Sequence, residues 1–457
     1  MANDALLYQQ DFSLDACVII TATGKPTDFR DVMLSFNYYE DIYGNFITGD
    51  ITINDSVGFL ANMSFDGTDF LILSFSKPSV EQTNITKTFR IYKVSDRHPT
   101  KDQNENYKLH FCSEEAVLNE QYKVSKSYKN QKISDIVKDI VYNQLKVDPK
   151  KFLNENLEVT SGVREIIIPN FKPFEALNWL ATQAISGNSK YLGASYLFYE
   201  NLNGYNFKSL QALYDIPPVA AFKYEPKNLN SADDTRLQDL NVEIKNVIGY
   251  DMIENWDYLN MVSTGAFANR LIAIDLLRLR YTVNDFDYLQ YFNSSVNMNP
   301  YPFLTGAQNR FKDTYNKTFD AMLKVTTTNT GDSTYSSYIK SHQPSIKDIN
   351  IETTVPYRSA QVPHINENKY RLTVPGDPLL TVGQVITFLL PEIVSQQIGQ
   401  KNPDKYYSGN FLITAVRHRI DTENKFLTVL EISKESVPNA YVEPNNSLAA
   451  WQNVRSK

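Results

Sequence analysis

The sequence predicts an α+β fold that is mainly β: two related small β-barrels, an inserted helix-plus-hairpin module and a peripheral insertion. Near both ends of the chain, apolar and polar residues alternate, which is typical of half-buried antiparallel strands. Two segments, Gly67–Ser113 and Gly383–Ser433, present the same elements in the same order. Between them, residues 114–215 carry the periodicity of amphipathic helices.

The two similar segments each contain a glycine turn, an apolar strand and a long hairpin. The hairpin opens with the same motif in both, Phe89-x-Ile91-x-x-Val94 and Phe411-x-Ile413-x-x-Val416. A polar bend and a return strand follow in each. Because any half-buried strand alternates with period two, chance could produce one such match. The recurrence of three elements in one order favours a duplicated barrel.

Residues 1–113 are predicted to form the first barrel. Short alternating runs recur at Cys17–Ile20, Val32–Phe36 and Ile47–Ile53, separated by turn signals. Strands at this spacing indicate a sandwich or a barrel. The polar run from Lys77 to Thr88 is predicted to be a loop or a hairpin tip.

Residues 114–215 are predicted to form an α+β module. One helical face collects the apolar residues Ile133, Ile136, Val137, Ile140, Val141 and Leu145. A second helix is predicted to begin at Pro173, since proline is favoured in the first turn, and to stop at Gly187. A hairpin follows, because Asn203-Gly204 lies between two aromatic runs.

The rest of the chain is divided into four parts. Residues 216–289 are a β segment, with a strand at Val242–Ile248 and either a helix or, as we prefer, a hairpin over 271–288. Residues 290–365 are an exposed insertion, because 290–356 are rich in Asn, Thr and Ser. Residues 366–437 form the second barrel, with a strand over Leu379–Pro391 that bends at Gly383, and 438–457 form a C-terminal arm.

Composition narrows the function classes. The apolar share of 42%, in a chain of 457 residues, is ordinary for a folded protein of two to four domains. The net charge of -7 argues against a general nucleic-acid binder. Two cysteines exclude a disulfide scaffold, and no secretory signal or apolar run long enough to span a bilayer is visible. The 29 Tyr and 25 Phe suit pleated sheets and subunit interfaces.

The motifs of known catalytic sites are missing from the sequence. The five histidines are not spaced as a zinc pair, and no Cys-x-x-Cys, G-x-S-x-G or phosphate-binding glycine loop occurs. We therefore predict no enzyme activity and assign no catalytic, cofactor-binding or metal-binding residue. Glu114-Glu115 is interpreted as a solvated acidic turn. Arg417 and Arg419 share a strand face, which either contacts an acidic partner or is solvated.

A basic run is the last charged feature with an open interpretation. It comprises Lys123, Lys126, Lys129 and Lys132 and is interpreted as a solvated face. Asp275 and Asp377 are interpreted as turn residues rather than ligands.

Several segments, taken in order, resemble the tail-hub proteins of contractile-tailed phages and the related hub module that opens type VI secretion spike proteins. These segments are Tyr39–Tyr43, Thr48–Asp55, the Gly67-x-Asp69 turn, Lys132–Val137, Pro173–Ala181, Val374–Gly383 and Tyr407–Ile413. Each motif is weak alone, and their order is what carries the resemblance.

The resemblance implies a structural hub of the tail baseplate. Such a hub is a homotrimer whose two barrels per subunit form a pseudo-hexameric ring. The ring joins the sixfold tail tube to the threefold central spike, contacts baseplate wedge proteins and lines the channel through which DNA passes. It implies a virion protein assembled in the host cytoplasm, without membrane insertion. This chain departs from spike proteins in having no long C-terminal β-helix and no lysozyme, so puncture falls to partners.

Two other functions stay open at the level of sequence. The tyrosine content is compatible with a tail-associated glycan-binding or glycan-cleaving β protein. A cleaving enzyme would need two carboxylates roughly 5–10 Å apart in a cleft. A minor capsid or wedge protein is the other alternative, and it would lack the repeated barrel.

Overall fold

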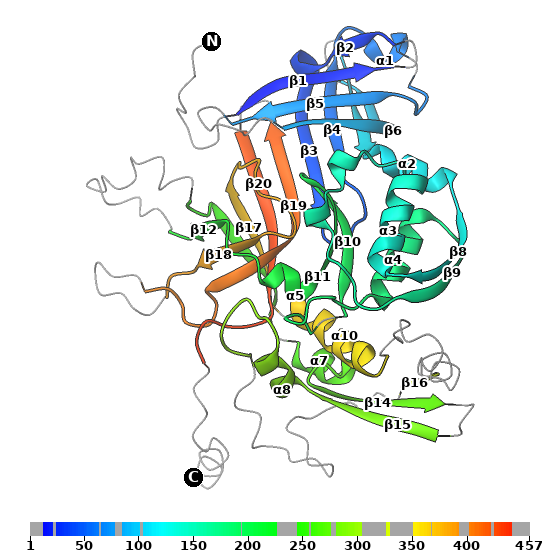
Figure 1. The fold of residues 1–457 in the computed structure, drawn as a ribbon. Coiled ribbons are helices and arrows are strands. Elements are labelled where there is room, and N and C mark those ends of the chain that lie inside the picture. Colours follow the sequence, from blue (N-terminus) through cyan, green and yellow to red (C-terminus); the bar gives the residue numbers. More distant parts are fainter. Residues whose placement is uncertain are drawn as a thin grey trace.

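The computed structural model describes residues 12–21, 24–63, 65–77, 85–100, 104–192, 194–225, 245–255, 257–275, 280–303, 326–329, 351–366, 368–392, 402–421 and 425–440. The described chain is mainly β with shorter helices, which confirms the predicted class (Figure 1). Its largest element is a 13-stranded sheet that contains strands from both ends of the sequence.

The first half of this sheet comes from the N-terminal residues. Its elements are β1 (Ser13–Ile20), β2 (Pro26–Asp28), β3 (Met33–Asp41), β4 (Thr48–Asp55), α1 (Phe59–Asn62), β5 (Phe70–Ser76), β6 (Ile85–Pro99) and β7 (Glu105–Cys112). We call β3, β4, β7, β6, β5 and β1, in their spatial order, the first half-sheet. Inward residues of these strands, among them Cys17, Ile51, Leu73 and Leu109, build one buried core.

The predicted α+β module follows directly. It contains α2 (Glu114–Gln121), β8 (Val124–Gln131), α3 (Ile133–Asp139), β9 (Arg164–Phe171), α4 (Pro173–Gln183), β10 (Tyr196–Asn201), β11 (Gly204–Ser209) and α5 (Leu210–Tyr214). A single π-helical turn, Ile140–Gln144, extends α3, so the predicted apolar face is continuous and fully buried. The hairpin on Asn203-Gly204 is confirmed, with Gly204 at φ 120°. The module lies to one side of the large sheet (Figure 1).

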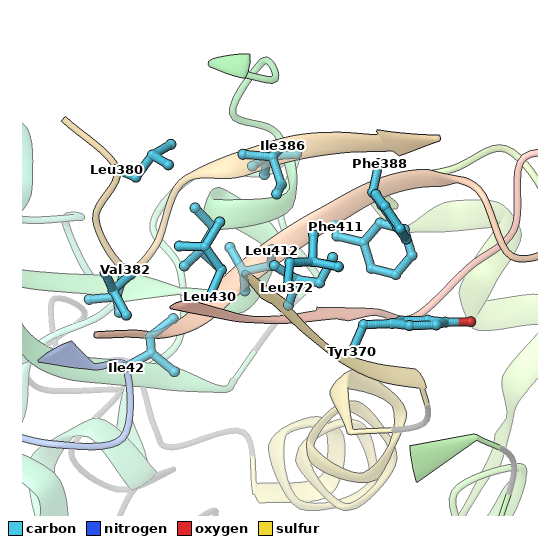
Figure 2. Packing of buried hydrophobic residues seen from close by; sticks show 14 of the residues in the cluster. Ile42, Tyr370, Leu372, Leu380, Val382, Ile386, Phe388, Phe411, Leu412 and Leu430 are labelled. Carbon is cyan, nitrogen blue, oxygen red and sulfur yellow. The ribbon is translucent and has the colours of Figure 1, made fainter. Parts of the chain in front are cut away.

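The C-terminal strands form the second half of the sheet. They are β12 (Ala220–Lys223), β13 (Gly249–Asn255), β17 (Asn368–Pro375), β18 (Val385–Leu389), β19 (Gly409–Asp421) and β20 (Lys425–Lys434). We call β13, β17, β20, β19, β18 and β12, in spatial order, the second half-sheet. Figure 2 shows its core, in which Tyr370, Phe388 and Phe411 pack beside Leu372, Leu412 and Leu430.

A peripheral unit is inserted between β13 and β17. Its described elements are α7 (Tyr258–Thr264), β14 (Ala268–Asp275), β15 (Arg280–Asp287), α8 (Tyr288–Ser294), β16 (Thr326–Asn329) and α10 (Ile351–Ile365). It has its own apolar cluster and lies at the end of the molecule away from β1 and β5 (Figure 1). The hairpin interpretation of residues 271–288 is confirmed, with Ile274 opposite Tyr281.

The two half-sheets have the same strand order, which supports the duplication that the sequence predicts. In each, a left-handed glycine precedes a strand and a hairpin: Gly67 at φ 87° before β5, and Gly383 at φ 84° before β18. β5 pairs with β6 and β6 with β7, just as β18 pairs with β19 and β19 with β20. β4 and β3 then correspond to β17 and β13. One difference is direction, because β1 runs antiparallel to β5 whereas β12 runs parallel to β18.

A bulge at the same position explains the repeated motif. The β6–β7 register shifts between Ile91 and Lys93, and the β19–β20 register shifts between Ile413 and Ala415. A bulge adds one residue to a strand and reverses the alternation beyond it. The apolar spacing therefore changes from two to three inside Phe-x-Ile-x-x-Val in both half-sheets.

Some expectations differ from the structure. The described strand pairs do not close into two separate barrels; β3 and β19 instead pair and join the halves into one sheet. Helix α4 ends at Gln183, not Gly187, because Ala184 is extended at ψ 142° and continues into a loop. Residues 379–384 form turns, so the predicted strand over Leu379–Pro391 shortens to β18, since the left-handed Gly383 interrupts it.

Other expectations fall partly outside the described residues. Val242 and Ile244 lie there, and the nearby strand begins at Gly249. Most of the predicted insertion and residues 441–457 of the predicted arm also lie outside. Helix α10 was not expected, because it contains Pro356 and Pro363, which usually interrupt helices.

We expect the two equivalent glycines to respond differently to alanine. A Cβ at Gly67 would meet no atom within 4 Å, whereas a Cβ at Gly383 would lie 2.2 Å from the hydroxyl of buried Tyr199. Gly67→Ala should cost about 1 kcal/mol for the left-handed backbone alone. Gly383→Ala should lower the free energy of unfolding by about 3 kcal/mol, because the steric overlap of the new Cβ with Tyr199 adds to the strain of the left-handed backbone. The midpoint of urea unfolding measures both, and equal losses would contradict the packing of Tyr199 on this turn.

Candidate functional site: the joint between the half-sheets

The joint is the antiparallel pairing of β3 with β19. Residues 35–41 pair with residues 415–421, from Ser35 opposite Asp421 to Asp41 opposite Ala415. β19 pairs with β20 on its other side, so the joint makes the sheet continuous. Figure 1 shows the two strands side by side, β3 in blue and β19 in orange.

Apolar residues from the second half-sheet complete the core of the first. Ile420 and Phe426 are fully buried in the cluster built by β1, β3, β5 and β7. The ring of Phe426 lies 6.2 Å from that of Phe75 in an edge-to-face arrangement. Because both halves contribute to one core, separating them would expose apolar surface on each side.

His418 occupies the centre of the joint as a neutral side chain. It is fully buried, and burial lowers the pKa of its imidazole to about 4. Nε2 lies 3.1 Å from the Leu380 carbonyl oxygen, which can only accept, so Nε2 carries the hydrogen. Nδ1 then accepts from the Thr428 hydroxyl at 3.0 Å. This neutral histidine therefore holds the joint through its two hydrogen bonds.

The two neighbouring arginines have separate roles. Arg417 donates to Oδ1 of Asn37 at 2.8 and 3.0 Å, and Asn37 in turn donates to Asp50 at 2.9 Å. This chain of hydrogen bonds crosses β19, β3 and β4. Arg419 is more exposed and pairs with Asp421 at 3.1 Å on its own strand. The sequence left open whether these arginines contact an acidic partner. Of the two, Arg419 is the candidate for such a contact, because its side chain is more exposed.

Glu40 fastens the joint to the turn before β18. It is 2% exposed and accepts hydrogen bonds from the Tyr38 hydroxyl, the Thr381 hydroxyl and the backbone N–H of Val382. Burial raises the pKa of this carboxyl above its ordinary value, although the three donors oppose the shift. One carboxyl group on β3 thus positions a segment of the second half-sheet.

A second buried carboxyl group, Glu200, attaches the α+β module to the first half-sheet. It accepts hydrogen bonds from the Ser113 hydroxyl and from the backbone N–H of Ile47. Burial, followed by the nearby charge of Glu115, raises the pKa of Glu200 to about 7. Glu115 itself is 5% exposed and pairs with Lys151 at 2.8 Å. The interpretation of Glu115 as solvated is wrong, because the first turn of α2 packs inward.

Lys434 is a buried cation at the end of β20. Its ammonium group donates to the carbonyl oxygens of Tyr406 and Ser408 at 2.6 and 2.9 Å and lies 4.7 Å from the centre of the Phe411 ring. Burial lowers the pKa of Lys434 to about 7. These contacts fix the loop that precedes β19.

The remaining sequence candidates are dispersed. His98 bonds the Asp96 carbonyl, His110 bonds Ser95, His364 stacks on Tyr288, and His342 lies outside the described residues. The lysines of the basic run are exposed, as expected. Asp377 accepts from the backbone of Leu379, so it is a turn residue as predicted, whereas Asp275 ends β14.

Metal-like clusters and membrane-spanning helices were also sought. Within the described ranges, no three or more His, Cys, Asp and Glu side chains gather as metal ligands would. No described helix has the length and apolar character needed to cross a bilayer.

Two concave regions were considered as substrate sites. One has a volume of about 600 Å³ and is lined by residues that include Lys132, Glu158 and Gly162. Glu158 already accepts from Ser186 and from the backbone of Ser209. The other contains Asp285 and Asp287, which pair with Arg270 and cap α8, respectively. These carboxylates serve structural roles, so neither region has a free catalytic pair.

Comparison with solved structures identifies the fold. A tail protein from Neisseria meningitidis MC58 superposes with a TM-score of 0.51 at 12% identity, covering 94% of this chain and 100% of that one. The 43 kDa tail protein of prophage MuSo2 from Shewanella oneidensis gives 0.51 at 11% identity, with 92% and 98% covered. No family model matches the sequence, and no curated protein matches it. The chain has the fold of phage tail proteins, which confirms the resemblance at that level.

We expect Glu200 to make stability depend on pH. Its pKa is 4.5 in the unfolded chain and about 7 in the fold, so its contribution is fully present below pH 4.5 and is lost as pH rises through about 7. The stability advantage of the protein over Glu200→Gln should fall by an amount on the order of 3 kcal/mol across this window. Lys434, whose pKa is lowered to about 7, changes the stability mainly above this pH window.

The measurement is urea unfolding of both proteins between about pH 4.5 and 7.5. Subtracting the two curves removes the contributions of the titrating groups that do not interact with Glu200, so the difference reports Glu200 together with its neighbours Glu115 and Lys151. A difference that does not change with pH would contradict the buried position of Glu200.

Proposed function

We propose that this protein is the structural hub of a phage tail baseplate. Three copies form a ring in which each copy supplies two similar units, so that a threefold object offers six similar contacts. The observation that carries the proposal is the repeated strand order of the two half-sheets, within a fold shared with two tail proteins. We further propose that each half-sheet serves as one of the two barrel-like units of the ring.

The partners follow from the symmetry of such a ring. A face with six similar surfaces suits a sixfold tail tube, and the opposite face suits a threefold central spike, with wedge proteins outside. The net charge of -7 supports a lumen that DNA passes without binding, because like charges repel. We place the protein in the virion tail, assembled in the host cytoplasm.

The buried chemistry of the joint supports a structural rather than an enzymatic role. His418, Glu40 and Glu200 each bond groups that hold the halves or the module together. The carboxylates of the two concave regions are likewise paired or capping. No observation among the described residues favours the glycan-cleaving alternative.

We expect the purified protein to be a trimer, or to become one when its spike partner is added. Multi-angle light scattering should report three times the chain mass of 52.3 kDa. A ring of this kind usually buries about 2,000 Å² or more per interface, so it should persist on dilution into the micromolar range. A monomer that persists even with the spike present would overturn the proposal.

A further inference from the structure

Several strand edges have no strand partner among the described residues, and two of them, on β13 and β6, resemble the strands of the joint. β13 pairs with β17 on one side, and no described strand pairs with its other side. β6 pairs with β7 over Arg90–Pro99 and with β5 over Ile85–Arg90, which leaves Lys93–Pro99 without a described strand on the side that faces β5. An open edge offers unpaired N–H and C=O groups to another strand.

The internal joint shows what these two edges fit. β3 corresponds to β13, and β6 corresponds to β19, by their places in the two half-sheets. In the joint, the edge of β3 pairs with residues 415–421 of β19, the part of that strand beyond its bulge. β19 is the counterpart of β6. The two open edges are the same pair of elements taken from the opposite halves. β13 lies at one end of the pairing order and β6 lies near the other end, so a second copy supplies the match.

We propose that the free edge of β13 in one copy pairs antiparallel with Lys93–Pro99 of β6 in the next copy, and that this pairing repeats the internal joint. The proposal rests on the trimeric ring of the proposed function and names the surface that closes it. Each copy carries one edge of each kind, so the contact is head-to-tail and closes when the rotation returns to the first copy.

The internal joint also fixes the register. Ile91 lies opposite Phe111, and Ile413 lies opposite Ile432, so counting outward makes Ser95 equivalent to Arg417. Arg417 lies opposite Tyr39 in the joint. The same counting through β4 and β17 makes Tyr39 equivalent to Glu254. Ser95 of one copy should therefore lie opposite Glu254 of the next.

The register places a second pair further along. His98 lies opposite Asn106, and Arg419 lies opposite Leu427. Asn106 lies as far along β7 from Phe111 as Leu427 lies along β20 from Ile432, so His98 and Arg419 are equivalent. Arg419 lies opposite Asn37, whose equivalent on β13 is Asp251. His98 should then lie opposite Asp251. Between the two pairs, β6 carries a further bulge at Asp96, which has φ 53°, so the pairing is interrupted there and resumes at His98.

The side chains on the two edges are complementary. β6 presents Lys93, Arg97 and His98, whereas β13 presents Asp251 and Glu254. Asp96 is the exception on β6, and it pairs with Lys108 of its own hairpin. Arg97 pairs with Glu105 of the same hairpin, so the charge complementarity rests chiefly on Lys93. Opposite charges on facing strands favour pairing, and like charges oppose it.

Apolar side chains at the same edges point to a covered surface. Met252 and Ile253 on β13 are 45% and 43% exposed, and Tyr92 at the bulge of β6 is 52% exposed. At the equivalent bulge of β19, which lies inside the joint, Thr414 is 1% exposed. A neighbouring copy would cover these residues as the joint covers Thr414.

Engineered cysteines test the pairing directly. Ser95→Cys combined with Glu254→Cys should give covalent dimers and trimers on mild oxidation, because directly opposed residues lie within disulfide range. The native Cys17 and Cys112 are buried, so background crosslinking should be low. The matched control combines Ser95→Cys with Ser127→Cys on exposed β8, which should give little covalent product.

Charge reversal gives an independent measurement that does not depend on oxidation. In the proposed register, Lys93 is a diagonal neighbour of Glu254 in the next copy. Glu254→Lys or Lys93→Glu alone should weaken self-association about tenfold, and the two changes in one chain should restore most of it. Sedimentation velocity over a concentration series measures the dissociation constant.

The outcomes separate this inference from the function on which it rests. Covalent trimers together with the charge-reversal rescue would support the pairing. A trimer in light scattering whose cysteine pair gives no more product than the control would overturn the pairing and leave the hub proposal standing. A protein that stays monomeric with its spike would overturn both.

Discussion

The pairing of β3 with β19 is the contact on which the rest of the architecture depends. It brings residues 35–41 and 415–421 into one sheet, although almost the whole chain lies between them. Ile420 and Phe426 then enter the core of the first half-sheet, and Glu40 bonds the turn that leads into β18. Since apolar burial, backbone pairing and buried hydrogen bonds act at one place, the halves should unfold as one unit rather than independently.

The two halves differ where they are connected to the rest of the chain. β3 and β4 are joined by the short segment Ile42–Ile47, whereas the corresponding strands β13 and β17 are separated by the whole peripheral unit. The α+β module follows β7, whereas no helix or strand of the described residues follows β20. Segments inserted at the ends of strands leave the strand order intact. The two half-sheets can therefore keep the same arrangement of strands while the segments that connect the strands differ. This arrangement fits the ring that we propose.

The sequence predicted the parts whose information is local. The helical face that contains Ile133 and Leu145 and the hairpin on Asn203-Gly204 depend on spacing along the chain, and both are confirmed. The repeated Phe-x-Ile-x-x-Val motif occupies equivalent positions in the two half-sheets, although these do not close into separate barrels. The bulge that explains the motif was not predicted, because a shift of register needs knowledge of the partner strand.

The missed features depend on distant partners. Nothing near β3 in the sequence indicates that β19 is its neighbour. In the sequence, the buried residues Glu40, Glu200 and Lys434 look like ordinary surface charges. The one signal of burial is that such a residue continues the inward-facing positions of an alternating strand, as Lys434 does in Leu430-x-Ile432-x-Lys434. Glu115 was misjudged for the same reason, since its partner Lys151 is remote. Helix α10 was missed because its two prolines outweigh its apolar positions.

The most direct measurement of the central claim is a cryo-electron microscopy reconstruction of the purified assembly, refined without imposed sixfold symmetry. The account predicts six similar sheets at one radius, alternating between the two halves of successive copies and continuous around the axis. A reconstruction in which the two halves lie at different radii, or in which one half never faces its counterpart, would contradict it.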